Sequence, residues 1–122
     1  DLVLIPMRGK QLDVDQAGRV VALIEREGKA FRRQIPYRVI FSMTSVLQSR
    51  EQKHIRATLD EKKIPVLSAA LSDRAAFSAI FQIGGTVFDL TSDDVSNPKA
   101  AQDNASTVAA AVLETLKEEA VQ

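Results

Sequence analysis

Three short apolar segments that alternate with helical patterns constrain the fold more than any other feature of the sequence. They cover residues 2–5, 37–43 and 66–71. Each is apolar at most positions and lacks a clean polar–apolar alternation, which is typical of parallel strands covered by helices on both faces. We therefore predict an α/β fold, a three-layer open parallel sheet built from right-handed βαβ units.

In the two intervals between these segments, the apolar residues recur at helical spacing. The first helix is expected to begin at Asp13 or Asp15, either of which can cap it, and to end at Gly28. The second helix is expected over residues 49–62, and Pro65 just beyond it is a stop signal. Both helices return the chain to the start of the next strand.

The rest of the chain predicts a third helix over residues 74–83, in which Phe77 and Phe81 are core residues. A short extended segment at 86–90 and a long helix over 98–119 follow. The sequence holds no internal repeat, low-complexity tract or linker. Residues 1–122 are therefore predicted to form a single α/β domain.

Composition excludes several classes of function. The 16 basic and 16 acidic residues cancel, so no global charge draws the chain to nucleic acid or to acidic membranes. The sequence has no cysteine, which excludes disulfides, zinc–thiolate sites and cysteine nucleophiles. No apolar run approaches the roughly 20 residues that a membrane-spanning helix needs.

Common catalytic motifs are absent from the sequence. It contains no GxxxxGK[ST] loop, no GxGxxG and no GxSxG. The single histidine, His54, lies among charged residues of a helical stretch and is expected to be solvated. Asp93 and Asp94 lie in a stretch typical of turns and helix caps, so we predict no metal site there.

Three stretches, taken in order, resemble the C-terminal half of the ParA/MinD-type partition ATPases, the deviant Walker P-loop family. DLVLIP at residues 1–6, followed by QLD at 11–13, resembles the segment after the family's Walker B strand. YRVIFSMT at 37–44 is similar to the family's next strand. SDRAAF at 72–77, followed by GGTVFD at 84–89, resembles a later family stretch and is the most specific of the three.

The resemblance implies a parent protein that is an ATP-dependent switch for DNA or plasmid segregation in the bacterial cytoplasm. Such a protein uses ATP and Mg²⁺, forms a homodimer, binds DNA non-specifically and is stimulated by a ParB-like partner, without a membrane. The family's P-loop and Walker B aspartate lie upstream of the matched stretches. We therefore expect no catalytic residue, no bound cofactor and no ATP hydrolysis in this chain. The chain begins abruptly in an apolar strand, so we expect it to be cut from a larger sheet.

The resemblance also implies a nucleotide site at the carboxyl ends of the strands, where open α/β sheets bind ligands. The residues expected on the base side of the nucleotide are Ser42, Thr44, Ser72, Asp73 and Arg74. Pro6 and Asp13 are expected next to the position of the family's P-loop.

A basic surface is the expected contact for DNA. Its candidates are Arg32, Arg33, Arg38, Lys53, Arg56, Lys62 and Lys63. Acidic residues interleave them, so an ordinary solvated face is the competing interpretation. The alternative function is a non-catalytic α/β regulatory or interaction domain of the flavodoxin or receiver type, which binds a nucleotide base or a partner protein. A receiver domain needs an acidic cluster after the first strand, where this chain has Pro6-Met7-Arg8.

Overall fold

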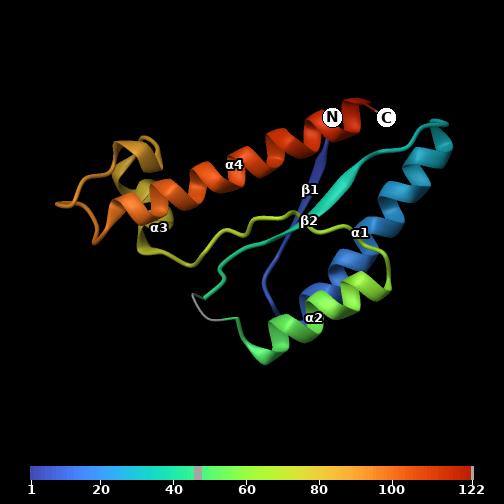
Figure 1. Ribbon diagram of the computed structural model, residues 1–122, viewed down its shortest axis with the longest axis horizontal. Coiled ribbons are helices and arrows are strands. Elements are labelled where there is room, and N and C mark those ends of the chain that lie inside the picture. Colours follow the sequence, from blue (N-terminus) through green and yellow to red (C-terminus); the bar gives the residue numbers. More distant parts are fainter. Residues whose placement is uncertain (46–47, 122) are drawn as a thin grey trace.

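A computed structural model describes residues 1–45 and 48–121 of the chain as an α/β arrangement (Figure 1). Its elements, in chain order, are β1 (Val3–Met7), α1 (Gln11–Ala30), β2 (Tyr37–Phe41), α2 (Arg50–Glu61), α3 (Ala75–Ile83), the 3-10 turn η1 (Val87–Asp89) and α4 (Pro98–Val121). None of the helices in these described residues is long and apolar enough to cross a membrane.

The sheet has two parallel strands, β1 and β2, in a register that runs from Val3 opposite Tyr37 to Met7 opposite Phe41. The prediction of a regular third strand at 66–71 is wrong, although this segment does follow the free side of β2.

The segment 66–71 does not form a regular strand, because it contains a bulge. Its Leu67 N–H donates to the carbonyl of Val39 at 2.8 Å, and its Leu71 N–H donates to the carbonyl of Phe41 at 2.9 Å. Four residues of the segment thus span the distance that two residues of β2 cover, and only isolated bridges form. The full three-layer sheet is therefore not present in the described residues.

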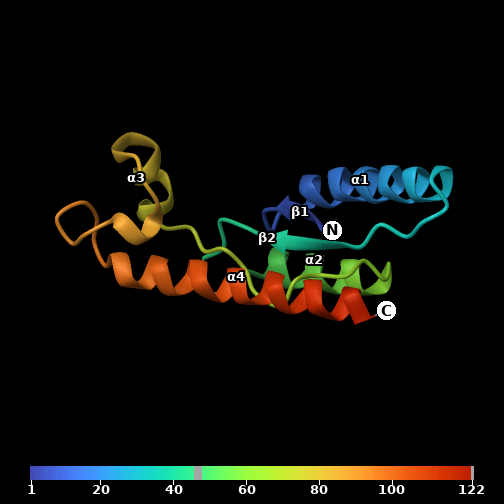
Figure 2. The same ribbon diagram turned by 90° about the horizontal axis from the view of Figure 1, so that it is seen from above.

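Helices cover both faces of the strands. The odd-numbered side chains of β1 and β2 pack with α1 and α2 in one core. Its buried members are Ile5, Met7, Val14, Ala17, Val21, Val39, Phe41, Ile55, Leu59 and Ile64. α4 crosses the other face, where Nη2 of Arg38 contacts Oε1 of Glu119 at 2.8 Å. Figure 2 shows α1 and α4 on opposite sides of the strands.

α1 is longer at both ends than predicted. It begins after Lys10, whose side chain makes no cap hydrogen bond, so the prediction that Asp13 or Asp15 caps the helix is wrong. It also continues through Gly28 to Ala30. Gly28 is buried because the chain folds back over it: a Cβ at this position would lie 2.7 Å from the carbonyl oxygen of Arg33.

α2 and α3 lie where the sequence predicts helices. Ser49 caps α2, with its hydroxyl accepting the N–H of Gln52 at 3.0 Å. α3 ends at Gly84, whose φ of +88° favours glycine.

The predicted extended segment at 86–90 is wrong, because a local capping box folds it into the turn η1. The Thr86 hydroxyl accepts the N–H of Phe88, and Asp89 accepts the N–H of Thr86 at 2.8 Å. This turn joins α3 and the first half of α4 around a second, small core of Ala76, Val87, Leu90 and Ala101.

Phe81 is not a core residue, contrary to prediction, since its side chain is 88% exposed, whereas Phe77 packs against the second core. α3 stands at one end of the molecule, where only one of its faces is covered (Figure 1). α4 likewise buries only Ala101 and Thr115. Apolar residues farther along α4 are partly covered, as at Val108, Val112 and Leu116, or exposed, as at Leu113.

Candidate functional site

The carboxyl ends of β1, β2 and the segment 66–72 are joined by backbone hydrogen bonds. The Ser42 N–H donates to the carbonyl of Met7 at 2.9 Å. Beyond β2, the Thr44 N–H donates to the carbonyl of Leu71 at 3.3 Å, and the Asp73 N–H donates to the carbonyl of Thr44 at 2.9 Å. The predicted residues Ser42, Thr44 and Asp73 therefore lie along one edge, which we call the carboxyl edge.

Asn104 of α4 fixes the position of Ser72 at this edge. Its Oδ1 accepts the N–H of Ser72 at 2.8 Å and the Ser72 hydroxyl at 2.9 Å, and its Nδ2 donates to the carbonyl of Ala70 at 2.9 Å. The Ser72 hydroxyl in turn accepts Nε of Arg74 at 3.0 Å. The chain of contacts from Asn104 through Ser72 orients a cation at the start of α3.

A groove of about 520 Å³ runs from the carboxyl edge along the free side of β1. Pro6, Asp13, Ser42 and Met43 line it. Met43 has a φ of +54°, unusual for a residue with a side chain, and is 61% exposed. Strained backbone of this kind costs about 1–3 kcal/mol and gathers at functional sites. Sequence reasoning named its two neighbours but missed Met43 itself.

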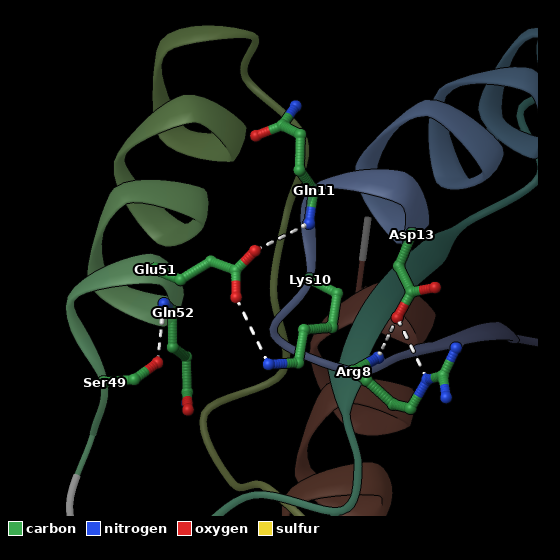
Figure 3. A network of polar contacts seen from close by, with 7 residues as sticks. All are labelled: Arg8, Lys10, Gln11, Asp13, Ser49, Glu51 and Gln52. Carbon is green, nitrogen blue, oxygen red and sulfur yellow. Dashed lines mark hydrogen bonds and ion pairs between the residues drawn. The ribbon is translucent and has the colours of Figure 1, made fainter.

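The carboxylate of Asp13 fixes the loop between β1 and α1. Its Oδ2 accepts the backbone N–H of Arg8 at 2.8 Å and lies 3.4 Å from Nε of the same residue (Figure 3). The interaction holds the loop in a turn that directs Arg8 back toward α1. Asp13 is thus a loop-fixing residue at the mouth of the groove.

Glu51 of α2 takes the place of the missing cap at the start of α1. Its Oε2 accepts the N–H of Gln11 at 3.4 Å, and its Oε1 lies 3.3 Å from Nζ of Lys10 (Figure 3). A carboxylate at a helix N-terminus is favoured by the helix dipole. No local sequence signal predicts this contact, because Gln11 and Glu51 are 40 residues apart.

The predicted DNA-contacting residues fall into two groups. Arg38 and Arg56 are already engaged: Arg38 pairs with Glu119, and the Arg56 guanidinium lies 4.3 Å from the centre of the Phe41 ring. The others are exposed and lie at separate places. They are Arg32 and Arg33 beyond the end of α1, Lys53 in α2, and Lys62 and Lys63 just beyond α2.

A second hollow, of about 1020 Å³, lies at the opposite end of the strands. Arg32 and Arg33 line it together with Tyr37 and Glu119. Burial and the nearby carboxylate of Glu25 raise the pKa of Tyr37 above its ordinary value of 10.0, while Arg38 opposes the shift. The described residues contain no group of three acidic, histidine or cysteine side chains placed to hold a metal ion. His54 is exposed.

No family model matches the chain. Over 119 residues, or 97% of its length, it is 39% identical to Protein ParA of Rhizobium radiobacter. The match covers 53% of that protein, so the chain spans about half the length of this curated relative. The similarity to this ParA protein thus extends over nearly the whole chain, in agreement with the resemblance carried by the three stretches.

Proposed function

We propose that this chain is the C-terminal portion of a partition ATPase of the deviant Walker type, an ATP-dependent switch for DNA or plasmid segregation. The observation that carries the proposal is the 39% identity to Protein ParA over nearly the whole chain. The chain itself lacks a P-loop. Without backbone donors and a lysine for the phosphates, it does not hydrolyse ATP alone.

In the intact protein we propose a three-layer parallel sheet that continues beyond the free edge of β1. Two features support this proposal. β1 is apolar along its length, and the groove beside it is lined by apolar residues of both β1 and α1. The remaining polypeptide then supplies the P-loop next to Pro6 and Asp13, and with it the sites for the ATP phosphates and Mg²⁺.

The carboxyl edge is proposed to form the base side of the nucleotide site. Ser42 and Thr44 offer hydroxyls at the end of β2, and Ser72, Asp73 and Arg74 offer polar groups on the neighbouring turn. The contacts between Asn104 and Ser72 and between Ser72 and Arg74 support a rigid wall there, because the side chains of Ser72 and Arg74 are held before a ligand arrives.

In the same proposal, the parent works in the bacterial cytoplasm as a homodimer that binds DNA non-specifically and responds to a ParB-like partner. Arg38 and Arg56 are already engaged by Glu119 and Phe41. The remaining DNA-contact candidates are exposed: Arg32, Arg33, Lys53, Lys62 and Lys63. Contacts with phosphates should weaken steeply with added salt.

A chimeric protein tests the proposal. This chain replaces the matched part of Protein ParA of Rhizobium radiobacter, and the remaining part of that protein is kept. We expect the chimera to bind and hydrolyse ATP with Mg²⁺, and Arg74→Ala to weaken ATP binding without loss of helix content. Arg26→Ala, at an exposed position of α1, is the matched control. A folded chimera that does not bind ATP would overturn the proposal.

A further inference from the structure

The alternation of backbone hydrogen bonds along β2 breaks just beyond the end of the strand. The Phe41 carbonyl accepts the Leu71 N–H from the segment 66–71, and Ser42 then donates its N–H to β1 on the other side. The same alternation would turn Thr44 toward β1 as well. Instead, the Thr44 N–H donates to the carbonyl of Leu71 at 3.3 Å. The backbone therefore rotates between Ser42 and Thr44.

Met43 makes this rotation, with a φ of +54°. Glycine enters this left-handed region readily, whereas a residue with a side chain is strained there. The sequence nevertheless has a long apolar side chain at this position, which belongs to neither core and is 61% exposed. β2 is paired on both sides, by β1 and by the segment 66–71, so this exposure is not that of an edge strand. Such a side chain has no role in the fold that glycine would not serve as well.

Polar residues surround this apolar side chain at the carboxyl edge. Ser42 and Thr44 flank it in the chain, and the Thr44 carbonyl accepts the N–H of Asp73 at 2.9 Å, next to Arg74. An apolar surface with a few polar groups beside it is the arrangement that binds a flat ring with polar edges. Methionine suits such a ring, because its thioether is polarizable and makes favourable contacts with aromatic systems.

We propose that Met43 is the platform for the purine ring of the bound nucleotide, with its thioether packed against the face of the ring. This inference rests on the proposed function, and it adds an apolar contact to the polar groups of the base side. Hydrogen bonds on both sides of Met43 fix the platform, since Ser42 is held by β1 and Thr44 by the segment 66–71. The strained backbone is what presents the thioether at the open edge.

Two ligands separate the base contact from the phosphate contacts in the chimeric protein described above. ATP with Mg²⁺ carries the ring, whereas tripolyphosphate with Mg²⁺ has the phosphate chain without it. In calorimetric titrations, we expect Met43→Ala to weaken ATP binding by about 2- to 10-fold, the range of a thioether–ring contact, and to leave tripolyphosphate binding unchanged. Met43→Leu keeps an apolar contact and should retain most of the ATP affinity. Leu113→Ala, at a similarly exposed apolar position of α4, is the matched control and should change neither.

Met43→Gly adds a measurement that separates ligand contact from a structural role. Glycine adopts this backbone conformation without strain, so the variant should unfold at a higher urea concentration than the chimera with Met43. The same variant should bind ATP as weakly as Met43→Ala does. A residue that only supported the fold would lose stability and ATP binding together.

The outcomes distinguish this inference from the proposed function. A folded chimera that does not bind ATP would overturn the proposed function, and the role of Met43 with it. A chimera that binds ATP, but in which Met43→Ala leaves ATP binding unchanged or weakens the binding of both ligands equally, would overturn the role of Met43 alone. A Met43→Gly variant with unchanged ATP affinity would have the same consequence.

Discussion

Asn104 of α4 and Ser72 are joined by two hydrogen bonds, from the Ser72 N–H at 2.8 Å and from its hydroxyl at 2.9 Å to the same amide oxygen. A third bond, from the Asn104 amide to the carbonyl of Ala70, completes the contact. The last helix is thereby attached to the carboxyl edge through one side chain. This contact makes α4 part of the candidate site as well as a cover for the sheet.

Replacing Asn104 by alanine should lower the free energy of unfolding by about 1–3 kcal/mol, because part-buried backbone groups of Ala70 and Ser72 lose their partners. Asn104→Asp keeps the acceptor and loses the donor, so its effect should be intermediate. Urea denaturation measures both. Ser106→Ala, at an exposed position of the same helix, is the control. An Asn104→Ala protein as stable as this control would show that the contact is not made in solution.

Two glycines of α1 should respond to alanine in opposite directions. At Gly28 the new Cβ would lie 2.7 Å from the carbonyl oxygen of Arg33, so Gly28→Ala should destabilise by about 1–3 kcal/mol. At Gly18 a Cβ meets nothing within 4 Å, so Gly18→Ala should stabilise the helix by about 0.5–1 kcal/mol. Thermal melts of the two variants give the comparison. Equal effects would contradict the close return of the chain over Gly28.

The ion pair between Arg38 and Glu119 should hold the end of α4 against β2. Its side chains are 19% and 25% exposed, so Glu119→Gln is expected to cost about 0.5–1 kcal/mol. Hydrogen exchange should accelerate in the last turns of α4, and the difference from the native chain should shrink in high salt. Glu118→Gln, at an exposed neighbouring position, is the control. Unchanged exchange in Glu119→Gln would argue against this contact.

Local signals predicted the elements whose structure is decided locally. Ser49 and Pro65 bound α2, and Gly84 ends α3, because caps and stops act within one turn of the helix. The apolar runs likewise predicted β1 and β2. The turn at Thr86–Asp89 has a local signal too, a capping box, but its apolar residues fit an extended segment equally well.

Long-range contacts decided the parts that sequence reasoning missed. The bulge between Leu67 and Leu71 depends on how the segment meets β2, and the exposure of Phe81 depends on what covers α3. The candidate site shows the same division between local and long-range signals. The sequence predicts Ser42 and Thr44 as site residues because they follow a strand. It does not predict Asn104, because this residue contacts Ser72 across 32 residues and no local pattern marks it.

Tyr37 should make the stability of the fold depend on pH in the alkaline range. Burial, with the Glu25 carboxylate nearby, raises its pKa above the ordinary value of 10.0, so the phenol holds its proton longer in the folded state. Between that value and the higher folded pKa, the folded state binds more protons than the unfolded state. The free energy of unfolding therefore falls as pH rises through this window, and Tyr37 has no effect on the pH dependence at lower pH.

The ultraviolet absorbance of the phenolate measures this directly, because Tyr37 is the single tyrosine and the chain has no tryptophan. We expect a midpoint above 10.0 in the folded protein that returns to the ordinary value in denaturant. Tyr37→Phe should remove the alkaline loss of stability that Tyr37 contributes. A folded midpoint at or below 10.0, or equal alkaline slopes in the two proteins, would contradict the partial burial of Tyr37 beside Glu25.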